Sequence, residues 1–298
     1  MRRIQIITDS CSDLTPELLE KYGVDYARMN TVHNGDVKQA DLSWTADEAH
    51  TFYEMMRNGE RITTTQVPPE EFDRVFRKHL ELGEDVVYIS CSNRQSGSIF
   101  TAEKQAESLR KEYPDADIRC IDSLHASTGE GMIAILAAEC AAKGGTMDQV
   151  ESRARELIRT THEFCTVHSL DYLKRAGRVK ASAAFFGNLM GVKPVIIANT
   201  EGEQTPVTKV KGRLNSFRTV AALLKDAMSG AAEGEHGTVY IAHADCSESE
   251  LEQLCELIRG ELGQVEILKG YMGPIIGASV GPDAVAVFGI GGPVRDQI

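Results

Sequence analysis

The stretch Val86-Val87-Tyr88-Ile89-Ser90-Cys91-Ser92-Asn93-Arg94-Gln95-Ser96-Gly97-Ser98 decides the fold. Its first residues form a short apolar run, which is typical of a buried parallel strand. A hydroxyl-rich turn follows, and from Ile99 an alanine-bearing pattern predicts a helix. Where a strand leads through a polar turn into a helix, free backbone N–H groups and the positive end of the helix dipole point to one place. The stretch therefore predicts a site for a carboxylate or a phosphate, although serine and asparagine are also common helix caps.

A second hydroxyl cluster lies upstream, in Thr63-Thr64-Thr65-Gln66. It also precedes a predicted helix, because the prolines and acidic residues of Val67-Pro68-Pro69-Glu70-Glu71-Phe72 favour a first helical turn. Two clusters of uncharged hydrogen-bonding groups, each placed just before a helix, favour a binding role over helix capping alone.

Strands and helices alternate through the N-terminal half of the chain. Strands are predicted at the N-terminus up to Asp9, at 86–90 and at 118–122, and Asn34-Gly35 predicts a hairpin within 24–42. This alternation predicts a mostly parallel, doubly wound sheet. Because such sheets bind ligands at the carboxyl ends of their strands, we expect Asp9-Ser10, Ser92 and Asp122-Ser123 to lie near a ligand.

Antiparallel signals are more frequent in the C-terminal half, which predicts a separate α+β domain with a mixed or antiparallel sheet. The predicted domains are 1–162 and 163–298, with the ligand cleft between them. Paired strands are predicted at 193–198 and 206–210, and an apolar helix at 182–190. The chain is predicted to close with two glycine-rich strands, Ile275–Ser279 and Ala284–Gly289.

Composition indicates an ordinary globular protein, with 298 residues, 42% apolar and 26% charged. The net charge of −12 argues against a nucleic-acid binder, and also against a protein held electrostatically on a membrane surface. No apolar run approaches the roughly 18 residues of a membrane span. The N-terminal residues turn polar too soon for a signal peptide, so we expect a cytoplasmic protein without a membrane span.

The seven cysteines are scattered, without a CxxC pair, and this pattern is typical of reduced thiols in the cytoplasm. A zinc site needs closely spaced Cys or His ligands. His162, Cys165 and His168 come nearest to that spacing, but strand alternation explains them better. No metal site is predicted.

Seven segments, in order along nearly the whole chain, resemble motifs of the DegV family of bacterial fatty-acid-binding proteins. They resemble the opening DS, the TSQPSPEEF segment, the SSxLSGT loop, the third motif, LKKGGRI, IKP and GTHTGPG. In this chain they are Asp9-Ser10, Thr64 to Phe72, Ser92 to Ser98, Asp122-Ser123 with Gly129, Leu173 to Val179, Val192-Lys193-Pro194, and Gly277 to Pro282.

The resemblance implies a two-domain protein that binds a long-chain fatty acid in a closed apolar tunnel. It further implies that the protein presents the carboxylate to a separate kinase subunit, which makes an acyl phosphate for phospholipid synthesis. The protein itself would then be a carrier and not an enzyme, with the fatty acid as its ligand and no other cofactor. The implied carboxylate site comprises Thr64, Thr65, Ser92, Asn93, Ser96, Gly97 and Ser279, and Arg178 would lie on the surface that meets the kinase.

Three segments depart from the family pattern. The paired serines read Ser92-Asn93, the SQP segment reads Thr65-Gln66-Val67, and the late histidine is replaced by Ser279. The last change removes an expected member of the hydrogen-bond network around the carboxylate. Asp283 also stands where a glycine is usual.

A serine hydrolase is the first alternative, because Gly277-Ala278-Ser279-Val280-Gly281 fits the GxSxG pattern. A nucleophile elbow needs a helix directly after the serine and a histidine later in the chain. Here a strand is predicted after Pro282-Asp283, and all eight histidines precede Ser279. The hydrolase is therefore disfavoured.

Nucleotide binding is disfavoured as well. Gly129-Glu130-Gly131-Met132-Ile133-Ala134 fits GxGxxA, but a capped helix is predicted from Thr146, where a dinucleotide site needs a strand that ends in an acidic residue. A pair of glycines that packs one helix closely is the better interpretation, and the sequence has no P-loop pattern. A carrier of a different acidic lipid, or an interaction protein without a ligand, remains the alternative to fatty-acid binding, and Arg178 could be a solvated surface charge.

Overall fold

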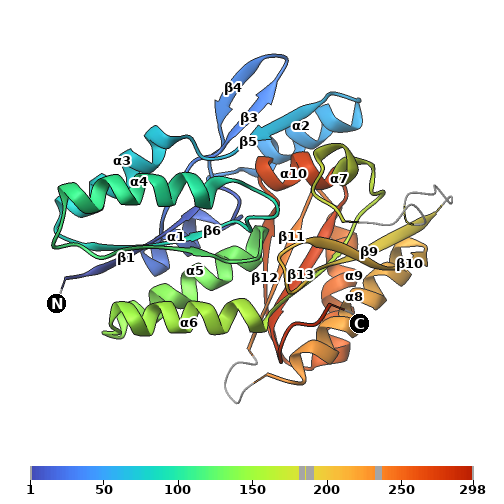
Figure 1. The fold of residues 1–298 in the computed structure, drawn as a ribbon. Helices are drawn as coiled ribbons and strands as arrows, with labels where there is room; N and C mark the ends of the chain where they lie inside the picture. The colour runs from blue at the N-terminus through green and yellow to red at the C-terminus, as the bar shows by residue number, and fades with distance from the viewer. Residues whose placement is uncertain (1, 181–184, 186–190, 232–236, 297–298) are drawn as a thin grey trace.

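A computed structural model describes residues 2–180, 185, 191–231 and 237–296. The helix expected at 182–190 falls almost wholly outside the described residues. The rest of the fold is α/β, with a parallel sheet in the N-terminal half and a mixed sheet in the C-terminal half, as the sequence predicted (Figure 1).

The N-terminal sheet contains four parallel strands in the order β2-β1-β6-β7. The strands are β1 (Ile4–Asp9), β2 (Asp25–Ala27), β6 (Asp85–Ser90) and β7 (Ile118–Asp122). Figure 1 shows α3 and α4 on one side of this sheet and α5 and α6 on the other. The surrounding helices are α1 (Pro16–Tyr22), α3 (Pro69–Glu81), α4 (Ser98–Glu112), α5 (Ser127–Ala142) and α6 (Met147–Thr160).

The C-terminal sheet contains six strands in the order β10-β9-β8-β13-β11-β12, and only β11 and β12 are paired in parallel. Its strands are β8 (Thr161–Thr166), β9 (Val192–Ala198), β10 (Gln204–Lys211), β11 (Thr238–His243), β12 (Glu266–Tyr271) and β13 (Val285–Ile290). Helices α8 (Arg213–Met228) and α9 (Glu248–Leu262) pack on each other, and α8 lies against β8, β9 and β13. The predicted pairing of 193–198 with 206–210 is confirmed.

Helix α5 links the two sheets because it contacts β1 and β6 on one side and β8, β11 and β13 on the other. It is buried on nearly all sides. Close packing explains Gly131, where a Cβ atom would lie 2.7 Å from Leu14 Cδ2 and 2.8 Å from the Ser12 carbonyl oxygen. The GxGxxA pattern therefore serves helix packing, and the interpretation made from the sequence is confirmed.

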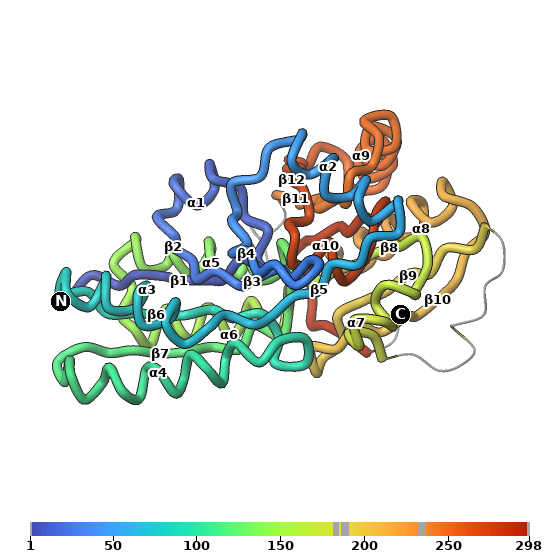
Figure 2. The backbone as a smooth tube through the Cα atoms, turned by 90° about the horizontal axis from the view of Figure 1, so that it is seen from above, coloured from blue at the N-terminus to red at the C-terminus, as the bar shows by residue number. Residues whose placement is uncertain are grey.

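A small antiparallel sheet, in the order β4-β3-β5, lies beside the junction of the two large sheets (Figure 2). It contains β3 (Asn30–His33), β4 (Asp36–Gln39) and β5 (Ile62–Thr65). The Asn34-Gly35 hairpin was predicted, and both residues adopt positive φ. Strand β5 was not predicted. Thr63-Thr64-Thr65 was interpreted as a hydroxyl cluster that precedes a helix, although threonine also favours strands.

The predicted strand at Ile275–Ser279 is wrong, because these residues form helix α10 (Pro274–Val280). Gly273 is extended and Pro274 occupies the first turn, which suits the start of a helix. The Gly273 N–H is satisfied by Asp13 Oδ1 at 2.8 Å, so the N-terminal half of the chain caps this helix. Helix α10 contacts β5, helix α2 (Ala46–Arg57) and helix α7 (Asp171–Ala176).

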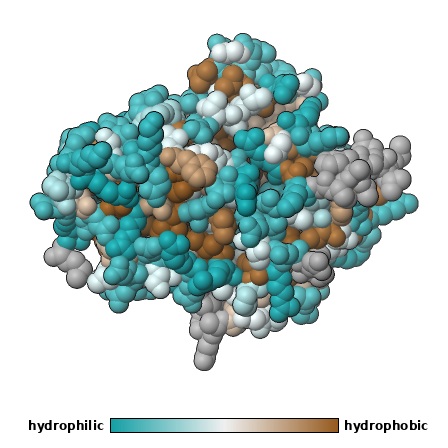
Figure 3. Space-filling view, in the orientation of Figure 1, coloured by the Kyte–Doolittle hydropathy of each residue, from teal (hydrophilic) through white to brown (hydrophobic). Residues whose placement is uncertain are grey.

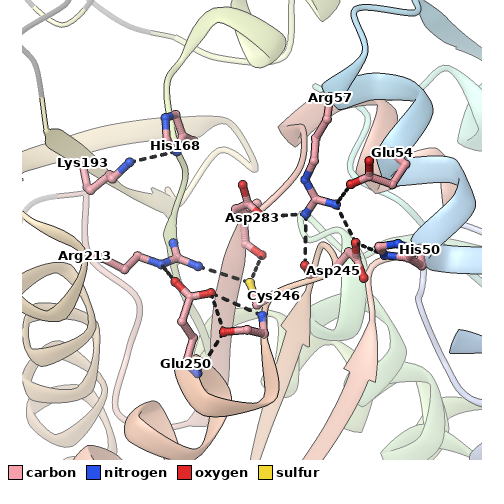
Figure 4. A network of polar contacts seen from close by, with 12 residues as sticks. His50, Glu54, Arg57, His168, Lys193, Arg213, Asp245, Cys246, Glu250 and Asp283 are labelled. Carbon is pink, nitrogen blue, oxygen red and sulfur yellow. Dashed lines mark hydrogen bonds and ion pairs between the residues drawn. The ribbon is translucent and has the colours of Figure 1, made fainter.

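Arg57, at the end of α2, ties the N-terminal half to the C-terminal sheet (Figure 4). Its guanidinium lies 2.6 Å from Asp245 Oδ2 and 2.6 Å from Asp283 Oδ1. Asp283 has a φ of 62°, which explains why glycine is usual at this position of the family motif. Aspartate tolerates this conformation better than most residues, and here its carboxylate gains an ion pair.

Candidate functional site

A cavity lies where the parallel sheet, the small sheet, helix α10 and the C-terminal sheet meet. It contains about 880 Å³ of space not filled by atoms, part of it open to solvent. Most of the face in Figure 3 is hydrophilic, with hydrophobic patches in its central part. The cavity lining combines apolar side chains with hydroxyl groups.

The apolar part of the lining comes from both halves of the chain. Leu173, Ile275 and Ile276 are buried, and they lie across from the C-terminal sheet. On that sheet Cys165 is paired with Ile196 and with Ala286, and all three line the cavity. Because Cys165 and Ala286 are small, the middle of the sheet leaves space for an apolar ligand. The remaining apolar lining comes from Cys11, Met29, Cys91, Ala126, Met272 and Val280.

Hydrogen-bonding groups gather where the cavity adjoins a second, outer pocket. Thr64 on β5, Ser279 near the end of α10 and Arg178 line both spaces, and Thr65, Ser96 and Gly97 line the cavity. The hydroxyls of Thr64 and Ser279 make no hydrogen bond with the described residues, nor does the Gly97 N–H. These three donors are therefore free to bind a ligand's acid group.

Gly97 leaves room for the Gln66 side chain, which lies directly over it. A Cβ atom there would approach Gln66 Oε1 far inside contact distance. Gln66 is held in place by a 2.8 Å hydrogen bond from Nε2 to Thr101 Oγ1. Gln66 was not predicted as a site residue, although it lies inside the Thr63-Thr64-Thr65-Gln66 cluster.

Ser92 and Asn93 do not line the cavity, so the structure does not place them with the other predicted carboxylate ligands. The Ser92 hydroxyl is buried and donates a 2.8 Å hydrogen bond to the carbonyl oxygen of Gly202. Asn93 is exposed, and its backbone N–H donates to Asp122. Both residues hold the turn against its neighbours, a role that a paired-serine motif does not distinguish from ligand binding.

Arg178 follows helix α7 and is exposed, but it is not a freely solvated charge. Its Nε donates a 2.8 Å hydrogen bond to the Gln95 carbonyl oxygen. The guanidinium is therefore fixed beside the Ser96-Gly97 turn. The outer pocket next to it has an empty volume of about 680 Å³ and carries two further cations, Arg61 and Arg175.

Ser279 is not the nucleophile of an elbow, because it lies near the C-terminal end of α10 and strand β13 follows. No histidine contacts it in the described part of the chain. The geometry agrees with the rejection of a serine hydrolase.

Glu163 is a buried acid in the cavity wall that sequence analysis missed. It lies on β8, two residues before Cys165, so both side chains face the cavity. Burial raises the pKa of the Glu163 carboxyl to about 7, although the hydrogen bond from Gln204 Nε2, at 3.2 Å, opposes the rise. Strand alternation alone could have placed Glu163 on the same face as Cys165.

No helix among the described residues has both the length and the apolar character that a membrane crossing demands.

The profile of the DegV family, described as uncharacterised proteins, matches residues 3–291. A DegV domain-containing protein of Clostridium perfringens is 31% identical over 293 residues, which is 98% of each chain. A DegV family protein of Thermus thermophilus, whose structure is described as showing fatty-acid binding, superposes with a TM-score of 0.84 at 26% identity, covering 97% of this chain and 99% of that one.

A stearic-acid-binding protein of Eubacterium ventriosum has the same fold, with a TM-score of 0.86 at 24% identity over 98% of both chains. Both halves of the chain, and the cavity between them, lie within the matched length. This protein belongs to the DegV family.

Proposed function

We propose that this protein binds a long-chain fatty acid in the cavity and presents its carboxylate to a separate kinase subunit in the cytoplasm. The observation that carries the proposal is the arrangement of the lining. Apolar side chains surround the interior, and the free donors of Thr64, Ser279 and Gly97 gather where the cavity meets the outer pocket. The fatty-acid-binding relative from Thermus thermophilus supports the choice of ligand.

The energies of the two parts of the ligand are consistent with this arrangement. Burying a sixteen-carbon chain gives on the order of 12 kcal/mol gross, at roughly 0.8 kcal/mol per CH₂. A buried carboxylate costs several kcal/mol unless it accepts hydrogen bonds. Each bond to a charged acceptor returns roughly 1.5–3 kcal/mol. The tail therefore supplies the affinity, and the hydroxyl and amide donors orient the acid group.

Thr64, Ser279 and Gly97 are the donors that we assign to the carboxylate, with Thr65 and Ser96 beside them. We do not assign this role to Ser92 and Asn93, because they lie outside the cavity. The assigned donors are uncharged, so they leave the carboxylate nucleophilic enough to attack the phosphoryl group of ATP on the kinase. The protein supplies no catalytic group of its own in this proposal and needs no cofactor.

Thr64→Val should weaken fatty-acid binding by roughly 10- to 100-fold, because one hydrogen bond to a charged acceptor is lost while the side-chain shape is kept. Native mass spectrometry of protein isolated from cells, followed by titration of the delipidated protein with palmitic acid, measures the change. Thr63→Val is the matched control, since Thr63 is exposed on the same strand and does not line the cavity. Equal ligand retention in the two variants would contradict the carboxylate site. A different acidic lipid in the wild-type spectrum would contradict the choice of ligand.

Arg178→Ala should retain the fatty acid but lose at least tenfold in acyl-phosphate formation, because the outer pocket where Arg178 lies is the side from which a kinase can reach the carboxylate. The measurement is turnover with the kinase subunit of a fatty acid kinase and ATP, with the acyl phosphate trapped by hydroxylamine. Arg155→Ala, which removes an exposed arginine on α6, is the control. Turnover equal to that of wild type would exclude the partner role of Arg178 and leave fatty-acid binding untouched.

A further inference from the structure

Two buried cysteines meet at the carboxyl ends of neighbouring parallel strands. Cys11 follows β1 and Cys91 follows β6, and their sulfur atoms lie 3.2 Å apart. Glu130, from helix α5, completes a group in which one ligand atom from each residue lies within 4.8 Å of the other two. The three residues are far apart in sequence, so the cysteine spacing gave no sign of this cluster.

Glu130 has an unsatisfied oxygen in this cluster. Its Oε1 accepts a 2.7 Å hydrogen bond from Thr8 Oγ1, whereas its buried Oε2 has no partner among the described residues. The residue is fully buried, and no ion pair of the described part of the chain involves it. A buried carboxyl oxygen without a hydrogen bond or a cation is costly, and it calls for a missing partner.

We propose that Cys11, Cys91 and Glu130 bind a zinc ion. Two thiolates and one carboxylate suit zinc, whereas calcium and magnesium prefer oxygen ligands only. In tetrahedral coordination with Zn–S bonds of about 2.3 Å, the two sulfurs would lie about 3.8 Å apart. The observed 3.2 Å needs only a small rotation of the side chains to reach that separation. All three residues bind the ion as anions, so binding releases to water the two thiol protons and any proton on the Glu130 carboxyl, and the ion supplies the missing partner of Glu130.

Asp9 holds both cysteines in position. Its Oδ1 accepts a 2.9 Å hydrogen bond from the Cys11 N–H, and its Oδ2 accepts a 3.3 Å bond from the Cys91 N–H. Tyr88 Oη fixes the same carboxyl at 2.7 Å. A single carboxyl group that orients two ligands is the outer-shell support typical of metal sites.

A metal ion can reach the proposed zinc site from the cavity. Cys11 and Cys91 both line it, so water can reach the ion from that side as a fourth ligand. A second cluster of metal-binding residue types among the described residues comprises His50, Glu54 and Asp245. Its two carboxylates do not lack a partner, because Arg57 pairs with both of them (Figure 4).

The test uses the full chain, purified under reducing conditions, stripped with a chelator and titrated with CoCl₂ and then with ZnCl₂. Wild type should bind one Co²⁺ with thiolate-to-cobalt absorption in the near ultraviolet, and Zn²⁺ should displace it. Cys11→Ala and Cys91→Ala should each weaken binding at least 100-fold, and Glu130→Gln at least tenfold. Cys165→Ala, which removes another buried thiol of the same cavity, should leave the titration unchanged.

Thermal unfolding without metal shows whether each variant is folded. Zn²⁺ should raise the melting temperature of wild type and of Cys165→Ala, and it should raise that of the three ligand variants less. Three results would overturn the proposal. The first is Co²⁺ bound without thiolate absorption, and the second is equal binding by wild type and Cys91→Ala. The third is a Cys11–Cys91 disulfide in the reduced preparation, seen as a mass lower by two hydrogens. Fatty-acid retention by stripped wild type is measured separately, so the zinc site can fail while the proposed function stands.

Discussion

Ala286→Phe should remove long-chain fatty-acid binding almost completely. Ala286 lies on the central strand β13, and its methyl group faces the cavity beside Cys165. A phenyl ring at this position fills the space that the small side chains leave for an alkyl tail. If it displaces four methylene groups, the loss is about 3 kcal/mol, or more than 100-fold in affinity. Titration of delipidated protein with fatty acids of increasing chain length measures the loss.

The dependence on chain length provides the internal control for Ala286→Phe. The loss should grow from decanoic to stearic acid, because a longer tail loses more buried surface, whereas a misfolded variant would lose all acids equally. Cys165→Phe, on the neighbouring strand β8, should reproduce the pattern. Unfolding of the ligand-free variants by heat should stay within a few degrees of wild type, since the ring enters existing space. Undiminished stearic-acid binding by both variants would show that the tail does not cross this part of the sheet.

The sequence predicted the two kinds of sheet because each has a local signature. The run at 86–90 and the helix after it form β6 and α4, and the capping residue Thr146 starts a helix where it was expected. These signals depend on neighbours in the chain, so no tertiary information is needed to recognise them.

The sequence did not predict helix α10, because what makes Ile275–Ser279 helical lies elsewhere in the chain. Gly277 is a poor helix former, and the stretch is too short to be stable alone. The helix is capped by Asp13 and packs against α2 and β5. A Cβ atom at Gly277 would lie 2.5 Å from Tyr53 Oη, so this close packing requires the glycine that weakens the helical signal.

The motifs indicated which segments approach the cavity, but not which side chains of those segments face it. Thr64, Ser96, Gly97, Ser279 and Arg178 do gather at one end of the cavity. The same motif could not tell Ser96, which faces the cavity, from Ser92, which faces Gly202, since both are serines of one turn. Contacts between distant segments, such as Cys11 with Cys91, leave no trace in local spacing.

Glu163→Gln should remove a strong pH dependence of stability. The pKa of Glu163 is about 7 in the folded protein, raised from 4.5 mainly by burial. The folded state therefore binds this proton more tightly than the unfolded state does. The stability that Glu163 contributes is present at low pH, declines as the pH rises from about 4.5, and is lost above about 7.

A shift of this size corresponds to a change on the order of 3 kcal/mol in the free energy of unfolding. Glutamine cannot ionise, and it still accepts the hydrogen bond from Gln204. The variant should therefore lie within about 1 kcal/mol of wild type at pH 5 and exceed its stability more clearly at pH 8, as measured by urea unfolding at both pH values. Glu256→Gln, at an exposed position of α9, should give the same difference from wild type at both. A difference for Glu163→Gln that does not change with pH would mean that this carboxyl is ionised, or solvated, throughout. In that case the wall of the cavity would be less apolar than a fatty-acid tail requires, so this measurement of stability also tests the chemistry of the proposed ligand.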